Sequence, residues 1–207
     1  MRAAVLFILL CALGRTAALA DDRSFDAIQP HEQTDSASAH LAYAEFLASN
    51  GKLRAAIVQW QTAQAIDPAN AAIANSLGGA YLRMGRAAES ADQFARAVGI
   101  ESNNAAYHYN LANVEFMLRR DLTVAWHMEP AELLRRALAE FRAASRLSPN
   151  DLEYARAYAE TFYGLPDPDW SEAEVAWKHV LELSPQRDFA YLQLARVSLK
   201  RGDKAQA

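Results

Sequence analysis

The sequence predicts an all-α protein built as an array of helical hairpins, and three observations support this prediction. A pattern of small and aromatic residues recurs with a period of 34 residues, as in the spacing from Gly51 to Gly85. Alanine is abundant and β-branched residues are sparse, which favours helix. Glycine and proline fall mostly between the apolar runs, where they end helices. One such hairpin cannot bury its apolar face alone, so the units are expected to stack.

Residues 1–20 have the pattern of a secretory signal peptide. A positive start at Met1-Arg2 precedes an apolar run from Ala3 to Leu13, and Ala18-Leu19-Ala20 places small residues before the expected cleavage site. The apolar run is too short to span a bilayer as a permanent helix. We therefore expect cleavage near Ala20-Asp21 and export to the periplasm or the cell exterior, with a bacterial periplasmic protein as the first choice.

Two other interpretations of this segment remain open. The segment is a buried N-terminal helix in the first interpretation. In the second it is a lipid-attachment signal at Cys11, although Ile8-Leu9-Leu10 lacks the small residues that precede such a site. Removing residues 1–20 removes Arg2 and Arg15 and no acidic residue, so the mature chain would have 19 basic and 25 acidic side chains and a formal charge of −6. It would hold no cysteine, which excludes disulfides and thiolate chemistry. An acidic surface also argues against a nucleic-acid partner.

A polar segment with no periodicity follows, and we interpret residues 21–36 as a flexible leader. Asp35 or Ser36 is placed to cap the first helix. The first two repeat units are expected at residues 37–70 and 71–104. Their matching positions are Gly51, Ala56, Trp60, Ala63 and Pro68 in the first unit and Gly85, Ser90, Phe94, Ala97 and Ser102 in the second.

The third unit, residues 105–151, carries the same pattern at Ala137, Phe141 and Ala144. Its two halves are too far apart, because 26 residues separate Leu111 from Ala137 where 13 separate Leu77 from Ser90. We therefore expect an insertion of thirteen residues near 119–131.

The fourth unit, residues 152–187, repeats the pattern at Ala173, Trp177 and Val180, with a turn two residues longer than the basic unit. In that turn, Asp169 or Ser171 is placed to cap the following helix. A partial fifth unit, residues 188–207, reaches Gly202 at the expected spacing and ends where its second helix would begin. Its first helix is either a terminal cap or part of a longer array. A cap should be polar outside, whereas this helix carries Phe189, Leu192, Val197 and Leu199.

These spacings resemble those of the tetratricopeptide repeat (TPR) family over residues 37–207. The resemblance implies a right-handed TPR helical-hairpin solenoid of four repeats plus a partial fifth, whose first helices line a concave groove. Carried onto this sequence, the groove would present Glu45, Asn75, Arg83, Tyr109, Asn113, Phe116, Arg156, Glu160, Tyr163 and Arg196. Aromatic side chains offer contact area there, while amides and arginines pair with the backbone and the acidic groups of a peptide. The alternative for each residue is an ordinary solvated position.

One known use of the family, gripping the C-terminal carboxylate of a chaperone, is incomplete here. Asn75 and Asn110 lie near clamp positions, but positions where the clamp requires Lys or Asn are occupied by Leu41, Glu45, Gly79 and Glu153.

The insertion is the most individual feature of the sequence. Leu122, Val124, Trp126 and Met128 alternate with less apolar residues, a period of two that predicts an extended segment lying against the repeats. Pro130 suits the first turn of the following helix. The insertion is either a docking element that presents Trp126 and Met128, or a segment whose Trp126 and Met128 shield the adjacent helices.

No catalytic, metal or cofactor site is expected. His40 and His108 occupy the same repeat position, which indicates a packing role, and no glycine-rich phosphate loop or nucleophile motif is present. An enzyme site would require His127, Glu129 and Glu132 of the insertion to converge.

The sequence thus favours a non-catalytic protein–protein interaction module or scaffold of the cell envelope that binds a polypeptide partner in its groove. A structural accessory of an envelope assembly, such as a pilus, secretion or outer-membrane complex, is the alternative. Self-association through the apolar C-terminal helix would favour that alternative, and an enzyme with a site on the insertion is a third hypothesis.

Overall fold

The computed structural model describes residues 36–186 and 188–202. The chain divides into two units, Met1–Asp35 and Ser36–Ala207, and the first, with the expected signal peptide and most of the expected leader, lies outside the described residues. The helices are α1 (Ala37–Ser49), α2 (Leu53–Ile66), α3 (Ala71–Arg83), α4 (Ala87–Ile100), α5 (Ala105–Met117), α6 (Arg119–Trp126), α7 (Pro130–Leu147), α8 (Leu152–Thr161), the 3-10 turn η1 (Phe162–Gly164), α9 (Trp170–Leu183) and α10 (Asp188–Arg201).

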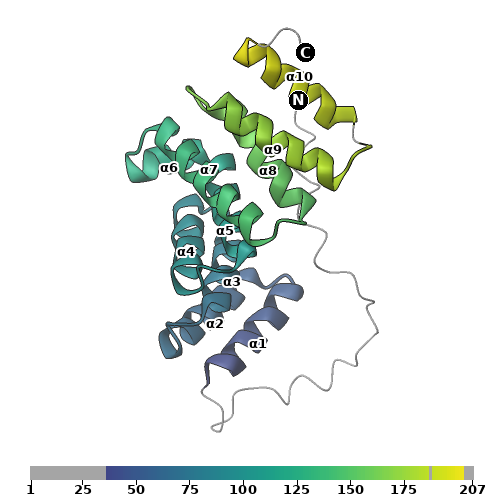
Figure 1. Cartoon of the computed structure of the whole chain (residues 1–207). Coiled ribbons are helices and arrows are strands. Elements are labelled where there is room, and N and C mark those ends of the chain that lie inside the picture. The colour runs from purple at the N-terminus through teal and green to yellow at the C-terminus, as the bar shows by residue number, and fades with distance from the viewer. Residues whose placement is uncertain (1–35, 187, 203–207) are drawn as a thin grey trace. The chain divides into compact units, whose positions relative to one another are not determined.

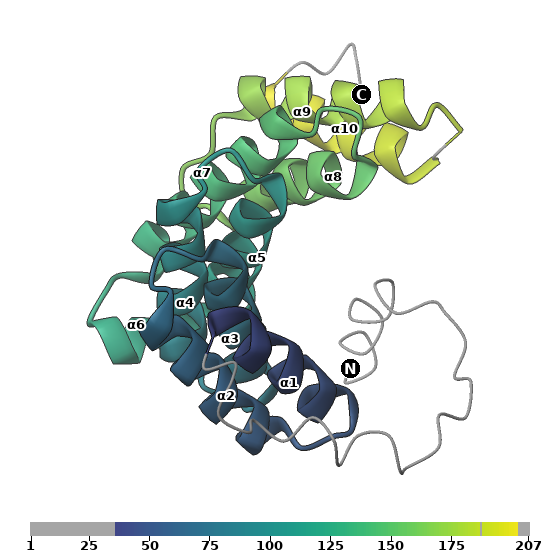
Figure 2. The same ribbon diagram turned by 90° about the horizontal axis from the view of Figure 1, so that it is seen from below.

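The helices pair as antiparallel hairpins that stack in chain order (Figure 1). The pairs are α1 with α2, α3 with α4, α5 with α7 and α8 with α9, while α10 packs on α9. Within the second unit the hairpins follow an arc, and α1, α3, α5 and α8 lie towards its inner side (Figure 2). The described residues contain no strand. The prediction of an all-α solenoid with four hairpins and one further helix is confirmed.

The helices begin and end where the sequence supplies caps. Ser36 and Asp169 accept hydrogen bonds from backbone N–H groups of the first turns of α1 and α9, which confirms the expected capping and satisfies donors that have no partner within the helix. Gly51 and Gly85 follow the C-cap residues of α1 and α3, with φ of 74° and 72°. Glycine takes this left-handed conformation without steric cost, so each glycine turns the chain into its second helix.

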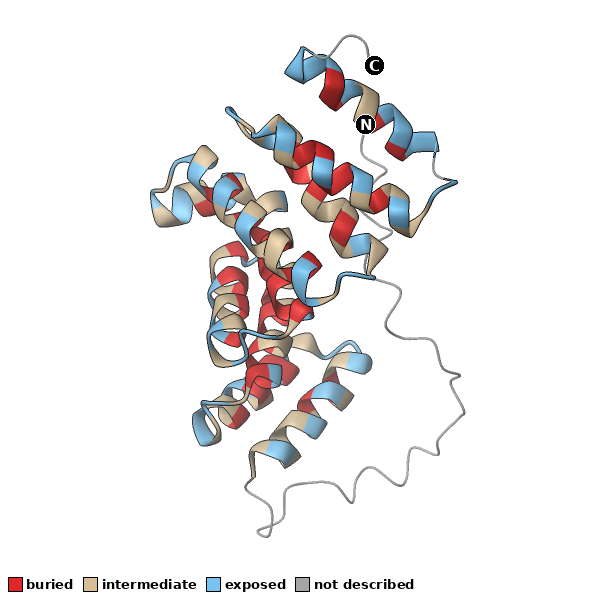
Figure 3. Cartoon of the chain, in the orientation of Figure 1, coloured by how far each residue is buried: buried red, intermediate tan, exposed pale blue. Residues whose placement is uncertain are grey.

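The seam between the paired helices depends on small residues. A Cβ built on Gly78 would lie 2.7 Å from the ring of Phe94, so only glycine lets α4 approach α3 this closely. The Ser90 hydroxyl donates a hydrogen bond to the Gly78 carbonyl at 2.8 Å and is itself buried. Ala56, Ala137 and Ala173 occupy the position of Ser90 in the other hairpins and are fully buried. Buried residues accordingly follow the faces along which the helices pack (Figure 3).

The insertion is helical, so the prediction of an extended segment was wrong. Leu122 and Trp126 lie one helical turn apart on α6 and pack into one apolar cluster with Leu133 of α7, whereas Val124 is exposed. An alternating pattern also fits a short helix when its apolar residues at i and i+4 face the core. His127, in the left-handed conformation with φ of 50°, ends α6.

Candidate functional site

The first helix of each hairpin presents the same four positions on its solvent-facing side. Counting from the first residue of each unit, these are positions two, five, nine and twelve, and the side chains there are exposed or half-buried in α1, α3, α5, α8–η1 and α10. We call this set the inner row. In the middle of the array it consists of Ala106, Tyr109, Asn113 and Phe116 from α5, and Glu153, Arg156, Glu160 and Tyr163 from α8 and η1.

Side chains of the inner row and next to it connect neighbouring first helices. The amide of Asn110 in α5 donates a hydrogen bond to Oδ1 of Asn75 in α3 at 2.8 Å. The hydroxyl of Tyr109 donates to Oε1 of Glu153 in α8 at 2.6 Å. Because these hydrogen bonds run from hairpin to hairpin, they fix the spacing of the polar groups on this surface.

Tyr109 lies at the centre of an aromatic cluster. Its ring centroid is 4.6 Å from that of Tyr154 and 5.7 Å from that of the buried Phe141, and Phe116 packs edge-on against the same Phe141 ring. Burial raises the pKa of Tyr109, and the carboxylate of Glu153 raises it further. The phenol therefore keeps its proton at neutral pH and acts as a hydrogen-bond donor. Tyr109 and Phe116 thus present an apolar surface on which one hydroxyl is held by a hydrogen bond.

The charged residues of α8 and α10 flank this cluster. Arg156 lies 3.6 Å from Glu160 one turn later on α8. The guanidinium of Arg196 in α10 stacks over the ring of Tyr163 at 4.8 Å, and the Tyr163 hydroxyl donates to the backbone carbonyl of Gln193 at 3.2 Å. These contacts tie α10 to η1 and leave the Arg196 side chain at the surface.

The structure thus brings six of the expected groove residues into one continuous surface on α5, α8 and η1, with Arg196 beside them on α10. Asn75 joins this surface through Asn110. Glu45 and Arg83 are exposed on α1 and α3. Sequence reasoning missed Phe189, Leu192 and Leu199, which it assigned to a terminal face. Counting back from Gly202 would have placed them at positions two, five and twelve of the inner row.

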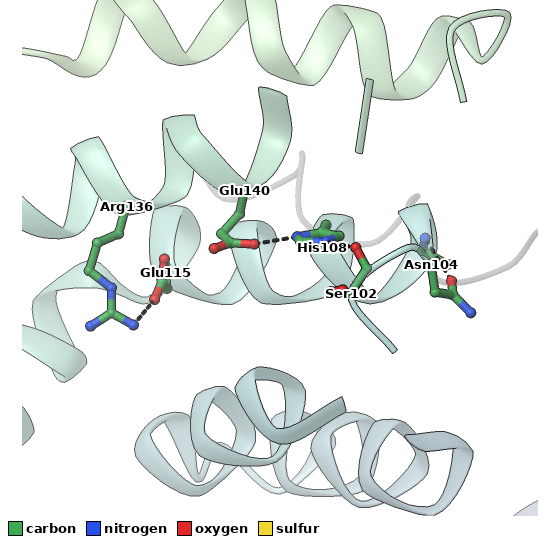
Figure 4. A network of polar contacts seen from close by, with 7 residues as sticks. Ser102, Asn104, His108, Glu115, Arg136 and Glu140 are labelled. Atoms are coloured by element: carbon green, nitrogen blue, oxygen red, sulfur yellow. Dashed lines mark hydrogen bonds and ion pairs between the residues drawn. The ribbon is translucent and has the colours of Figure 1, made fainter. Parts of the chain in front are cut away.

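A second cluster of polar side chains lies between α5 and α7 (Figure 4). His108 contacts Oε2 of Glu140 at 2.5 Å and donates through Nε2 to the Ser102 carbonyl at 2.9 Å, which supports the packing role inferred for this histidine. Glu115 is fully buried and pairs with Arg136 at 2.5 Å. Burial raises the pKa of Glu115 to about 7, against the opposing effect of the Arg136 charge.

The insertion packs against the Arg136 side of this ion pair. The guanidinium of Arg136 lies 5.1 Å from the centroid of the Trp126 ring and donates to Sδ of Met128 at 3.9 Å. Trp126 and Met128 also pack against the apolar cluster beneath α6. This geometry favours the shielding role over the docking role for both residues.

The side chains named for the enzyme hypothesis do not form a site. His127, Glu129 and Glu132 are all exposed, and the interaction of Glu132 is with Arg135 at 3.5 Å. Within residues 36–186 and 188–202, no group of three or more His, Cys, Asp or Glu side chains is arranged to hold a metal ion. No helix in the same part of the chain is long and apolar enough to cross a membrane.

The fold is similar to that of tetratricopeptide repeat proteins. Residues 46–85 match the family described as TPR repeat, and no curated protein matches significantly. Among solved structures, the chain is similar to YrrB, described as a TPR protein with an unusual peptide-binding site, at 20% identity with a TM-score of 0.67, covering 83% of this chain and 81% of YrrB. It is similar to MamA from Desulfovibrio magneticus RS-1 at 13% identity and a TM-score of 0.62, covering 83% of this chain and 89% of MamA.

A third similar structure is the first TPR domain of Spaghetti (RPAP3), bound to the HSP90 peptide SRMEEVD. The identity is 17% and the TM-score 0.54, and the match covers 67% of this chain and all of that domain. At these identities the similarity shows the fold alone.

Proposed function

We propose that this protein is a non-catalytic protein–protein interaction module that binds an extended segment of a polypeptide partner along the inner row. The observation that carries the proposal is the continuous surface of Tyr109, Phe116, Arg156 and Tyr163, which combines aromatic contact area with fixed polar groups. Such a combination is typical of protein-binding surfaces. The peptide-binding site of YrrB and the peptide held by the RPAP3 domain support the same use of the fold.

We further propose that the protein acts outside the cytoplasm, as a bacterial envelope protein. The support is the pattern of residues 1–20, with its positive start, its apolar run and its small residues before Asp21. The acidic balance of the remaining chain fits a protein partner and no nucleic acid. A structural role within an envelope assembly is the second candidate, because α10 exposes apolar side chains that suit contact with another subunit, including a second copy of this chain.

Two glycines provide a matched test of the proposed surface. Gly79 lies on α3 at position nine of the inner row, and Gly99 lies on α4, the second helix of the same hairpin. Neither has any atom within 4 Å of a built Cβ, so both sites have room for a larger side chain. Gly79→Trp is expected to obstruct the inner row, whereas Gly99→Trp changes the second helix of the same hairpin and leaves the inner row open.

The probe is a displayed library of random peptides selected on the chain from residue 21 onward. We expect peptides recovered on the parent protein to lose binding to Gly79→Trp and to retain binding to Gly99→Trp, with unchanged helicity of both variants in circular dichroism. Equal binding to both variants would show that peptides do not use the inner row. Failure to recover any peptide would contradict the interaction module itself.

A further inference from the structure

The inner row changes character at its C-terminal end. In α3 its positions hold small and polar residues, namely Ala72, Asn75 and Gly79, followed by Leu82. In α10 the corresponding positions hold Phe189, Leu192, Arg196 and Leu199, and Lys200 occupies the next position. We call these five side chains the α10 patch. Along the described helices the row therefore changes from small and polar side chains in α3 to apolar and cationic side chains in α10.

The apolar members of the α10 patch are exposed although they lie close together on one helix. Phe189, Leu192 and Leu199 are 50%, 60% and 58% exposed. Phe189 packs edge-on against Trp177 of α9, with ring centroids 5.9 Å apart, which fixes its position beside the inner row. Clustered exposed apolar side chains mark an interaction site more often than single ones do.

The two cations of the α10 patch have no acidic partner among the described residues. Arg196 stacks on Tyr163 and donates to the amide oxygen of Gln193 at 3.1 Å, both of them neutral groups. No ion pair of Lys200 is found in the described part of the chain, whereas the neighbouring Arg201 pairs with Glu174 of α9. The whole chain carries a formal charge of −4, so this cationic end stands out against an acidic protein.

We propose that the α10 patch binds a partner segment in which aliphatic residues are interspersed with acidic side chains. Arg196 and Lys200 lie one helical turn apart, so they suit more than one carboxylate, and a chain terminus supplies one only. Aliphatic side chains of the segment cover Leu192 and Leu199, and its acidic side chains approach the two cations. This inference rests on the proposed function, since it assigns the partner chemistry of one end of the same surface.

The setting of the patch favours a peptide over a membrane. Anionic lipid also attracts apolar and basic helix faces, but the guanidinium of Arg196 stacks over the ring of Tyr163, so the patch continues the inner row of α8 and η1. An extended chain follows such a curved row, while a flat bilayer does not reach it.

Charge reversal provides the test, with a matched control at the other end of the described chain. The test protein combines Arg196→Glu with Lys200→Glu, and the control combines Lys52→Glu with Arg54→Glu, two exposed basic residues at the start of α2. A second test protein, Leu192→Ser, addresses the apolar part and keeps the charges. The displayed random library is selected on each protein in parallel. One peptide recovered on the parent protein is then synthesised with blocked ends, with its acidic residues intact or changed to amides.

We expect the parent and control proteins to enrich peptides that are both aliphatic and acidic. The charge-reversed protein is expected to lose the acidic preference and to bind the intact peptide about tenfold more weakly, as the loss of two surface ion pairs and their replacement by repulsion implies. Leu192→Ser is expected to lose the aliphatic preference. The parent affinity should fall with added salt.

Three results would overturn the inference. The first is an unchanged preference of the charge-reversed protein for acidic peptides. The second is equal binding of the acidic and the amide peptide to the parent protein. Both results leave the proposed function intact. The third is that the charge-reversed protein selects the same peptides as the parent but loses another interaction. That interaction is either sedimentation with anionic phospholipid vesicles or self-association measured by light scattering. If no peptide at all is selected on the parent protein, or if peptides bind Gly79→Trp as well as the parent, the proposed function is contradicted instead.

Discussion

The buried carboxyl of Glu115 is expected to make the stability of the protein depend on pH in a direction opposite to that of most carboxylates. Its side chain is fully buried, and burial raises its pKa from 4.5 to about 7, while the charge of Arg136 acts against the rise. Among the described residues no hydrogen bond of ordinary geometry reaches either oxygen, so the ion pair with Arg136 is the contact that offsets the buried charge. The folded protein therefore binds the proton of the Glu115 carboxyl more tightly than the unfolded chain does.

The sign follows from proton binding. Between pH 4.5 and about 7 the folded state retains a proton that the unfolded state has released, so the contribution of Glu115 to the unfolding free energy is fully present below pH 4.5 and is lost as the pH rises through 7. At about 1.4 kcal/mol per pH unit, the interval from 4.5 to about 7 corresponds to about 3 kcal/mol.

The substitution Glu115→Gln removes the titrating group and keeps its shape. We expect the unfolding free energy of Glu115→Gln minus that of the parent protein to increase by about 3 kcal/mol from pH 4.5 to pH 8, because only the parent protein loses the contribution of Glu115. Urea denaturation followed by circular dichroism at several pH values measures the difference between the two proteins, which cancels the carboxylates they share. Parallel stability curves over this range would refute the reasoning. Glu182→Gln, at an exposed position, is the control. If its unfolding free energy relative to the parent changes with pH in the same way, the effect is due to net charge instead.

Three further outcomes follow from the packing. Gly78→Ala is expected to destabilise the fold by about 1–3 kcal/mol in urea denaturation, because its Cβ would lie 2.7 Å from Phe94, whereas Gly79→Ala, with open space, should be neutral or stabilising by up to about 1 kcal/mol. Trp126→Ala is expected to increase hydrogen exchange of α6 amides while exchange in α3 stays unchanged, because the ring packs on the apolar cluster and on Arg136. Glu174→Gln is expected to increase exchange in α10 more than in α9, because this carboxylate pairs with Arg201 of α10 as well as with Lys178 within α9. Unchanged exchange in α10 would show that its pair with Arg201 contributes nothing to holding this helix.

The periodic part of the fold could be predicted from the sequence because few residues determine it. The spacing of glycine, small and aromatic residues fixes where each helix ends and how closely its partner approaches, and Gly85, Ser90 and Phe94 take the roles that this spacing implies. The insertion could not be predicted in the same way. A period of two over a few residues fits both a strand and a short helix, and only the burial of Leu122 and Trp126 against α7 decides between them.

The candidate site was predictable to the extent that it follows the repeat. Tyr109, Phe116 and Tyr163 lie together because the repeat brings position five or twelve of each unit to one side. The same counting applies to α10. There the hydrophobicity of Phe189 and Leu192 suggested a terminal face, whereas counting along the repeat assigns both residues to positions two and five of the inner row. Exposure and the contacts of Arg196 place these side chains at the end of the inner row.

The deviations of the third hairpin are best understood as one coupled change. Glu115 occupies the repeat position that Leu47, Tyr81 and Phe162 fill with buried apolar side chains. A carboxylate there requires a cation, and Arg136 on α7 supplies it. The helix α7 is 18 residues long, where α2, α4 and α9 have 14, and its extra first turn adds the buried Leu133.

An ion pair at a helix seam is weakened by water, so it also needs a cover, and the insertion provides one. Trp126 stacks on the outer side of Arg136 and Met128 accepts a hydrogen bond from it. Without α6 the same pair would lie open at the edge of the array, where an exposed ion pair contributes little. The extra residues thus place the Trp126 ring and the Met128 sulfur against the cation that pairs with Glu115, at a seam where the neighbouring hairpins use an apolar side chain.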